Sequence, residues 1–132
     1  MTIPLPIETE RLLIRPFEAG DVDAMAEVYG DPEVMRAGAV VGDIGCGVYA
    51  PTGEPELGYT LAAGFWGRGY ALEAARACIE AAFANLPQRR LVARVESGND
   101  RSLRLAERLE MRPVETIAID GRPHVLLALE RA

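Results

Sequence analysis

The sequence predicts an α/β protein with a central mixed, mostly antiparallel sheet, helices on both faces and one parallel pair of strands. Two observations carry this prediction. Segments of strand and helix periodicity alternate along the second half of the chain, and a glycine turn introduces the longest helical segment. With 132 residues, 49% of them hydrophobic, the chain is predicted to form a single domain over residues 1–132.

The first half of the chain predicts a strand, a short helix and an antiparallel hairpin. Residues 11–17 alternate like a strand, and residues 21–29 carry apolar side chains at helical spacing before a Gly-Asp-Pro break. The glycine-rich segment 39–49 and the segment 57–62 both read as strands and flank a turn. This arrangement indicates that they form a hairpin.

The second half predicts the order strand, helix, strand, helix and a terminal hairpin. Its segments are a glycine turn followed by a helix within 64–87, a strand over 90–96, a helix within 97–111 and hairpin strands over 114–119 and 124–130. A helical crossover makes the strands around Tyr59 and Val92 parallel if they are neighbours. Pro123 favours a hairpin loop longer than two residues, although Asp120-Gly121 is a tight-turn pair.

Charge is distributed unevenly along the chain, whose net charge is −6. Residues 1–65 hold three arginines and eleven acids, whereas residues 66–132 hold eleven arginines and nine acids. An acidic chain argues against nucleic acid, but a basic half suits a polyphosphate ligand and an acidic half a cationic one. An uneven solvated surface explains the same pattern equally well.

Other classes of partner are disfavoured by what the sequence lacks. It has no run of eighteen apolar residues and no signal-peptide pattern, so we expect a soluble, cytoplasmic protein without a membrane partner. Cys46 and Cys78 fit no metal or disulfide spacing and are interpreted as core residues. We therefore expect no metal cofactor.

The glycine turn before the long helix is the most informative local motif. Residues 66–71 read Trp-Gly-Arg-Gly-Tyr-Ala, and glycines at a helix start let the backbone approach a phosphate closely. A tight turn also needs glycine for purely structural reasons, so the motif alone leaves both interpretations open.

The wider sequence around this turn resembles the GNAT superfamily of N-acetyltransferases, and in particular its RimJ/RimL-like branch. The resemblance is carried by Gly58-Tyr59, by residues 66–71 with Glu73, by Asn99 with Ser102, and by the opening stretch 8–35. It runs from about Ile7 to the last hairpin.

The resemblance implies a GNAT domain that transfers an acetyl group from acetyl-CoA to a primary amine. The branch favours a protein N-terminal amine, and the superfamily also acts on small amines. A non-catalytic CoA-binding or protein-interaction module derived from the same fold is the alternative.

The resemblance also implies a set of cosubstrate contacts. The pyrophosphate would be held by Trp66, Gly67, Arg68, Gly69, Tyr70 and Ala71. The pantetheine arm would pair with the backbone of Tyr59, Thr60 and Leu61, and would meet Asn99 and Ser102 near the thioester. Arg104, with Arg101 and Arg108, would help to hold the CoA phosphates. A plain helix cap at Asn99 and a solvated helix face for the arginines are the alternatives.

Catalysis needs a base, an oxyanion donor and a proton donor. The resemblance implies a backbone N–H near Leu61 as the oxyanion donor. Glu56 is the candidate base, directly or through water, with a solvent-facing carboxylate as its alternative. His124 is a reserve base that more often has a structural role. Ser102 is the candidate proton donor because Ala106 stands where many superfamily members have a tyrosine.

Two departures from the family pattern bear on activity. Glu110-Met111 replaces the usual Gly-Phe, and a helix and strand that the family usually carries between Met35 and Ala39 are missing. The missing region often shapes the acceptor pocket. A homodimer is plausible, because the loss would expose an edge or an apolar patch.

Overall fold

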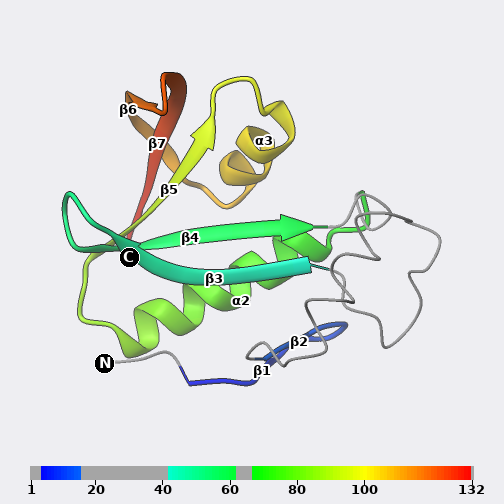
Figure 1. Ribbon diagram of the computed structural model, residues 1–132. Coiled ribbons are helices and arrows are strands. Elements are labelled where there is room, and N and C mark those ends of the chain that lie inside the picture. The colour runs from blue at the N-terminus through cyan, green and yellow to red at the C-terminus, as the bar shows by residue number, and fades with distance from the viewer. Residues whose placement is uncertain (1–3, 16–41, 62–66, 132) are drawn as a thin grey trace.

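The computed structural model describes residues 4–15, 42–61 and 67–131 (Figure 1). The described elements are β1 (Ile7–Glu8), β2 (Leu13–Ile14), β3 (Gly42–Tyr49), β4 (Glu54–Leu61), α2 (Tyr70–Asn85), β5 (Arg90–Glu96), α3 (Asp100–Arg108), β6 (Arg112–Ile119) and β7 (Arg122–Glu130). The predicted helix over 21–29 lies outside the described residues. From β3 onward the order of strands and helices is the predicted one, whereas the strand β1 was not predicted.

The main sheet has five strands in the order β3-β4-β5-β7-β6. Every neighbouring pair is antiparallel except β4 and β5, which are parallel, so the predicted mixed sheet is confirmed. The hairpin of β3 and β4 also forms as predicted, with Gly42 opposite Leu61 and Tyr49 opposite Glu54.

The parallel pair β4 and β5 is joined over a very short length. Its only Cα partners are Glu56 and Val92, whereas β3 and β4 pair along their whole length. Beyond Glu56 the two strands diverge, and Figure 1 shows β4 and β5 running apart toward their carboxyl ends. We call this stretch, where the last residues of β4 have no β5 backbone paired with them, the opening beside β4.

Two ion pairs cross the joined end of β4 and β5. Arg90 donates to Glu54 from Nε at 2.7 Å and from Nη2 at 2.8 Å. Arg94 holds both oxygens of Glu56, with Nη2 at 2.9 Å from Oε1 and Nε on Oε2. Arg94 also lies over the ring of Tyr49, 5.5 Å from its centroid. These side-chain contacts hold β4 and β5 together at the end where their backbones are paired.

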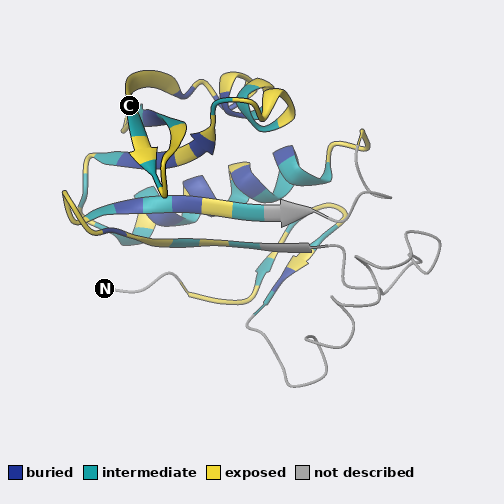
Figure 2. Ribbon diagram, turned by 45° about the horizontal axis from the view of Figure 1, so that its top comes forward, coloured by how far each residue is buried: buried dark blue, intermediate teal, exposed yellow. Residues whose placement is uncertain are grey.

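The core lies on both sides of the sheet because successive strand residues point to opposite faces. On one side Leu91, Ala93 and Val95 of β5 join a large apolar cluster to which both described helices contribute. On the other side Val92 packs in a smaller cluster, with Tyr49, Leu126 and Ala128 around it. Figure 2 shows how the buried positions of α2 face the sheet.

The terminal hairpin differs from the prediction in its loop. Asp120 and Gly121 alone connect β6 and β7, with φ of 52° and 78°, so the longer loop predicted from Pro123 is wrong. Pro123 pairs with Ala118, and its carbonyl accepts a 3.0 Å hydrogen bond from the Ser97 N–H. The strand β5 ends at Glu96, so β7 has already passed the end of its neighbour at Pro123. The missing proline N–H would face Ser97, one residue beyond the end of β5, so the proline removes no bond between β7 and β6.

The first predicted strand is much shorter than residues 11–17. Only Leu13–Ile14 form a strand within the described part, and they pair with Ile7–Glu8 as a small separate ribbon. The Thr9 hydroxyl accepts from the Leu12 N–H at 3.0 Å, and the Thr9 N–H donates to the Leu12 carbonyl at 2.9 Å. These bonds fold residues 9–12 into a turn, which the alternating pattern did not indicate.

Candidate functional site

The predicted glycine turn leads directly into α2. Gly67 and Gly69 have φ of 78° and 79°, a conformation that favours glycine, and Gly69 is the residue before the first helical turn. No side chain caps this helix start. Its first N–H groups and the positive end of the helix dipole are the features that suit a phosphate. The exposed turn thus fits the pyrophosphate cradle predicted for it, while Trp66 lies outside the described residues.

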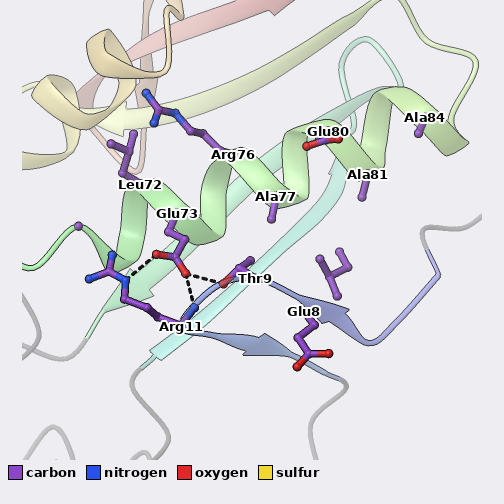
Figure 3. A pocket seen from close by; sticks show the side chains of 12 residues that line it. Glu8, Thr9, Arg11, Leu72, Glu73, Arg76, Ala77, Glu80, Ala81 and Ala84 are labelled. Carbon is purple, nitrogen blue, oxygen red and sulfur yellow. Dashed lines mark hydrogen bonds and ion pairs between the residues drawn. The ribbon is translucent and has the colours of Figure 1, made fainter.

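Glu73 fastens the β1–β2 ribbon to the beginning of α2. Its carboxylate accepts a 2.5 Å hydrogen bond from the Thr9 hydroxyl, and bonds from Arg11 N–H at 2.9 Å and Arg11 Nε at 2.7 Å (Figure 3). The hydrogen bond from Thr9, followed by those from Arg11, lowers the pKa of the Glu73 carboxyl.

Thr9 and Arg11 were not predicted as site residues. Sequence reasoning had one signal for them, the resemblance of the opening stretch to the family. No periodicity or spacing rule links them to a helix more than sixty residues away.

Tyr59, Asn99 and Ser102 meet at the opening beside β4. Ser102 of α3 lies close to the hydroxyl of Tyr59 from β4, so α3 and β4 approach each other here. Burial raises the pKa of Tyr59, and the nearby Ser102 side chain partly offsets this. Asn99 caps α3 through a 3.2 Å bond from the Ser102 N–H to its Oδ1. The cap interpretation of Asn99 is therefore confirmed, and a ligand contact by its remaining amide stays a prediction.

Glu56 lies at the joined end of β4 and β5, not at the opening. The Arg94 guanidinium donates to both of its oxygens, so the predicted base is engaged in an ion pair away from the opening. The alternative of a plain solvent-facing carboxylate is also inaccurate, because Glu56 is half-buried.

The remaining predicted residues have simpler surroundings. Thr60 and Leu61 end β4, with their backbones opposite Asp43 and Gly42 of β3. Arg104 is exposed on α3. His124 of β7 makes a 3.0 Å contact from Nδ1 to the Arg122 carbonyl, a local structural role.

Both cysteines belong to the core, as predicted. Cys78 of α2 is buried and Cys46 of β3 is half-buried in the large apolar cluster, and both are free thiols. Burial, with a smaller effect of the neighbouring Cys78, raises the pKa of Cys46 to about 11. Across the described ranges no group of three His, Cys, Asp or Glu side chains is placed to hold a metal ion. The helices described in them are too short or too polar to span a bilayer.

The fold agrees with a match to a known protein family. Residues 36–112, which include the turn, α2, β5 and α3, match the acetyltransferase (GNAT) domain family. The chain belongs to the GNAT acetyltransferases. The matched range contains the parallel pair β4–β5 and the turn before α2.

Two curated relatives of this chain are proteins of Bacillus species. The chain is 36% identical over 95 residues to the uncharacterized protein YkkB of Bacillus subtilis, covering 69% of this chain and 54% of that protein, so it spans about half the length of this relative. It is 26% identical over 140 residues to the uncharacterized N-acetyltransferase p20 of Bacillus licheniformis, covering 76% of this chain and 79% of p20. The second match therefore includes about 40 positions that this chain lacks.

Solved structures agree with this assignment. The GNAT acetyltransferase of Bacillus anthracis superposes with a TM-score of 0.80 at 25% identity, covering 96% of this chain and 98% of that one. Mycobacterium smegmatis RimJ in complex with CoA-disulfide superposes with a TM-score of 0.54 at 24% identity, covering 58% of this chain and 40% of that one. At this identity the RimJ likeness shows a shared fold.

The contact between Glu73 and the ribbon predicts a dependence of stability on pH. Because the Glu73 pKa is lowered in the folded protein, its stabilising effect is present above the ordinary value of 4.5 and is lost as pH falls through the folded-state pKa. We expect Glu73→Gln to be less stable than wild type at pH 7 in urea titrations. The difference should shrink as pH is lowered below 4.5.

Glu107→Gln is the matched control, because Glu107 is an exposed acid of α3. It should leave stability nearly unchanged at each pH. A Glu73→Gln difference that stays constant from pH 7 down to pH 3 would show that the carboxylate charge does not hold the ribbon.

Proposed function

We propose that this domain transfers an acetyl group from acetyl-CoA to a primary amine. The observation that carries the proposal is the opening beside β4, where the parallel pair is joined only at Glu56 and Val92. The glycine turn of α2 follows β4 in the chain, and α3 approaches β4 through the contact between Ser102 and Tyr59. One long ligand with phosphates at one end and a reactive thioester at the other would suit this combination.

The contacts of acetyl-CoA follow from this arrangement. The N–H groups of residues 67–71 would bind the pyrophosphate, with Arg68 adding positive charge. The backbone of Tyr59, Thr60 and Leu61 would pair with the pantetheine arm as an added strand, because β5 has moved away from that edge. Asn99 and Ser102 would lie near the thioester, and Arg104 would serve the CoA phosphates. The RimJ complex with CoA-disulfide supports CoA as the ligand class.

The reaction needs two proton movements. It forms an amide C–N bond and breaks the thioester C–S bond, so the amine nitrogen loses a proton and the departing sulfur gains one. A backbone N–H near Leu61 would stabilise the developing oxyanion. Ser102 would give the proton to sulfur, and the nearby Tyr59 hydroxyl is a second candidate donor.

Among the described residues to which we assign a role, none is placed to take the proton of the amine directly. The Arg94 pair occupies both oxygens of Glu56. We infer that Glu56 acts through water, after its pair with Arg94 opens, or that bulk water removes the proton from an amine that binds uncharged.

The acceptor we favour is the N-terminal amine of a protein. The RimJ/RimL-like pattern of Gly58-Tyr59, residues 66–71 and Asn99 supports this choice, and the acidic first half of the chain suits a cationic amine. The chain lacks about 40 positions present in p20, which is consistent with a more open acceptor site. Because both cysteines are free thiols, we place the protein in the reducing cytoplasm.

A non-catalytic CoA-binding module is the second candidate. Two observations favour it, the buried Ala106 where many relatives have a tyrosine and the engagement of Glu56 by Arg94. Turnover separates the two candidates.

We expect release of free CoA thiol that depends on both acetyl-CoA and an amine. The assay would compare peptides with free and blocked N-termini, and small amines such as polyamines, at equal concentration. The chain has no lysine, so acetylation of its own side-chain amines cannot contribute to the signal. Saturable CoA binding without turnover on any amine would favour the binding-module reading.

Removal of the Ser102 hydroxyl should impair chemistry more than binding. We expect Ser102→Ala to lower kcat about tenfold, and Tyr59→Phe to lower kcat by less, with smaller changes in KM for acetyl-CoA. Thr116→Ala removes an exposed hydroxyl on β6 and is the matched control. If Ser102→Ala raises KM and leaves kcat unchanged, Ser102 binds the pantetheine arm and is not the proton donor.

A further inference from the structure

The Arg11 guanidinium contacts the glycine turn as well as Glu73. Its Nη1 donates to the carbonyl of Arg68 at 2.9 Å, and its plane lies over the ring of Tyr70, 4.6 Å from the centroid. A Cβ added to Gly69 would lie 3.3 Å from Nη2. One side chain from the β1–β2 ribbon therefore touches three consecutive residues at the start of α2.

The orientation of Arg11 is set by Glu73. The Nε of Arg11 donates to Oε1 of Glu73 at 2.7 Å, and the backbone N–H of Arg11 donates to Oε2 at 2.9 Å. The hydroxyl of Thr9 shares Oε2 at 2.5 Å. Figure 3 shows the three donors converging on this carboxylate from one side. Both ends of the guanidinium are thus fixed, one on Glu73 and the other on the turn.

Fixing the Arg68 carbonyl also fixes the next N–H. A trans peptide is planar, so the N–H of Gly69 points away from the direction of the Arg68 carbonyl. The glycines on either side of Arg68 have no Cβ to restrict this peptide plane, and both have positive φ. Without the bond from Arg11, the plane could rotate and turn the N–H away from a ligand.

We propose that Arg11, held by Glu73, is a positioning residue that fixes the glycine turn in the conformation needed to bind the CoA pyrophosphate. This inference rests on the proposed function. It assigns to the first ribbon of the chain a role in cosubstrate binding. Arg11 acts through the Arg68–Gly69 peptide and not as a ligand of the phosphates.

Arg11 could instead attract the phosphates directly by its charge. The two roles predict opposite effects of Glu73→Gln on the affinity for CoA. With direct attraction, Glu73→Gln, which removes a negative charge from the site, would strengthen CoA binding. Positioning predicts that Glu73→Gln weakens it, because the Gln amide nitrogen would face the Nε donor of Arg11. Arg11→Lys keeps the positive charge but loses the planar guanidinium that contacts Glu73 and the Arg68 carbonyl together. Only the positioning role therefore predicts that Arg11→Lys weakens CoA binding.

The experiment measures the dissociation constants of CoA and of pantetheine by calorimetry. Pantetheine carries the same thiol arm without the pyrophosphate and nucleotide. We expect Arg11→Lys and Glu73→Gln each to raise the dissociation constant for CoA about fivefold and to leave that for pantetheine unchanged. Arg112→Ala, which removes an exposed arginine of β6, is the control and should change neither constant.

The outcomes separate this inference from the proposed function. If wild type binds CoA no better than pantetheine, there is no pyrophosphate cradle, and both fail. If wild type prefers CoA but the two variants keep that preference, or Glu73→Gln increases it, the positioning role is overturned while the proposed function stands. An unfolding curve of each variant checks that it is folded. If only one of the two variants folds, its preference for CoA over pantetheine is enough to test the positioning role.

Discussion

The short junction between β4 and β5 is the constraint on which the rest of this domain depends. Two parallel strands of a sheet normally stay together, but these are paired only at Glu56 and Val92. The junction is stabilised on one face by the pairs of Arg90 with Glu54 and Arg94 with Glu56. On the other face it is stabilised by the apolar cluster that contains Leu57 and Leu91. Each ion pair is partly exposed and contributes modestly, so we assign most of the stability to apolar burial.

The consequence of a junction at one end is an opening at the other. Strand β4 continues to Leu61, and it leaves one edge without a neighbouring β5 backbone. The connection after β4 leads through the glycine turn into α2. The connection after β5 leads into α3, which carries Asn99 and Ser102 at its start. A binding site for an extended ligand therefore follows from the divergence of two strands.

Much of this arrangement could be predicted from local sequence signals. The helix α2 and the strand β5 were predicted from apolar spacing, and β5 has the predicted bounds of residues 90–96. The positive φ of Gly67 and Gly69 agrees with a turn that needs glycine. These features depend on neighbours a few residues apart, which is the range over which sequence patterns are informative.

The other contacts join side chains from distant parts of the chain. Nothing in the sequence indicated that Arg94 would engage Glu56, because their pairing depends on the register between β4 and β5. The link between Arg11 and Glu73 likewise depends on where the ribbon docks. The two-residue hairpin loop was missed because Pro123 lies beyond the end of β5, where a strand tolerates a missing N–H.

The most direct test of the central claim is a comparison of backbone amide NMR signals with and without acetyl-CoA. If the opening beside β4 is the cosubstrate site, the largest changes will occur at Gly58–Leu61, at the first turn of α2 and around Ser102. The hairpin of β6 and β7 will change little. Changes concentrated in that hairpin, or an unchanged spectrum at saturating acetyl-CoA, would contradict the account.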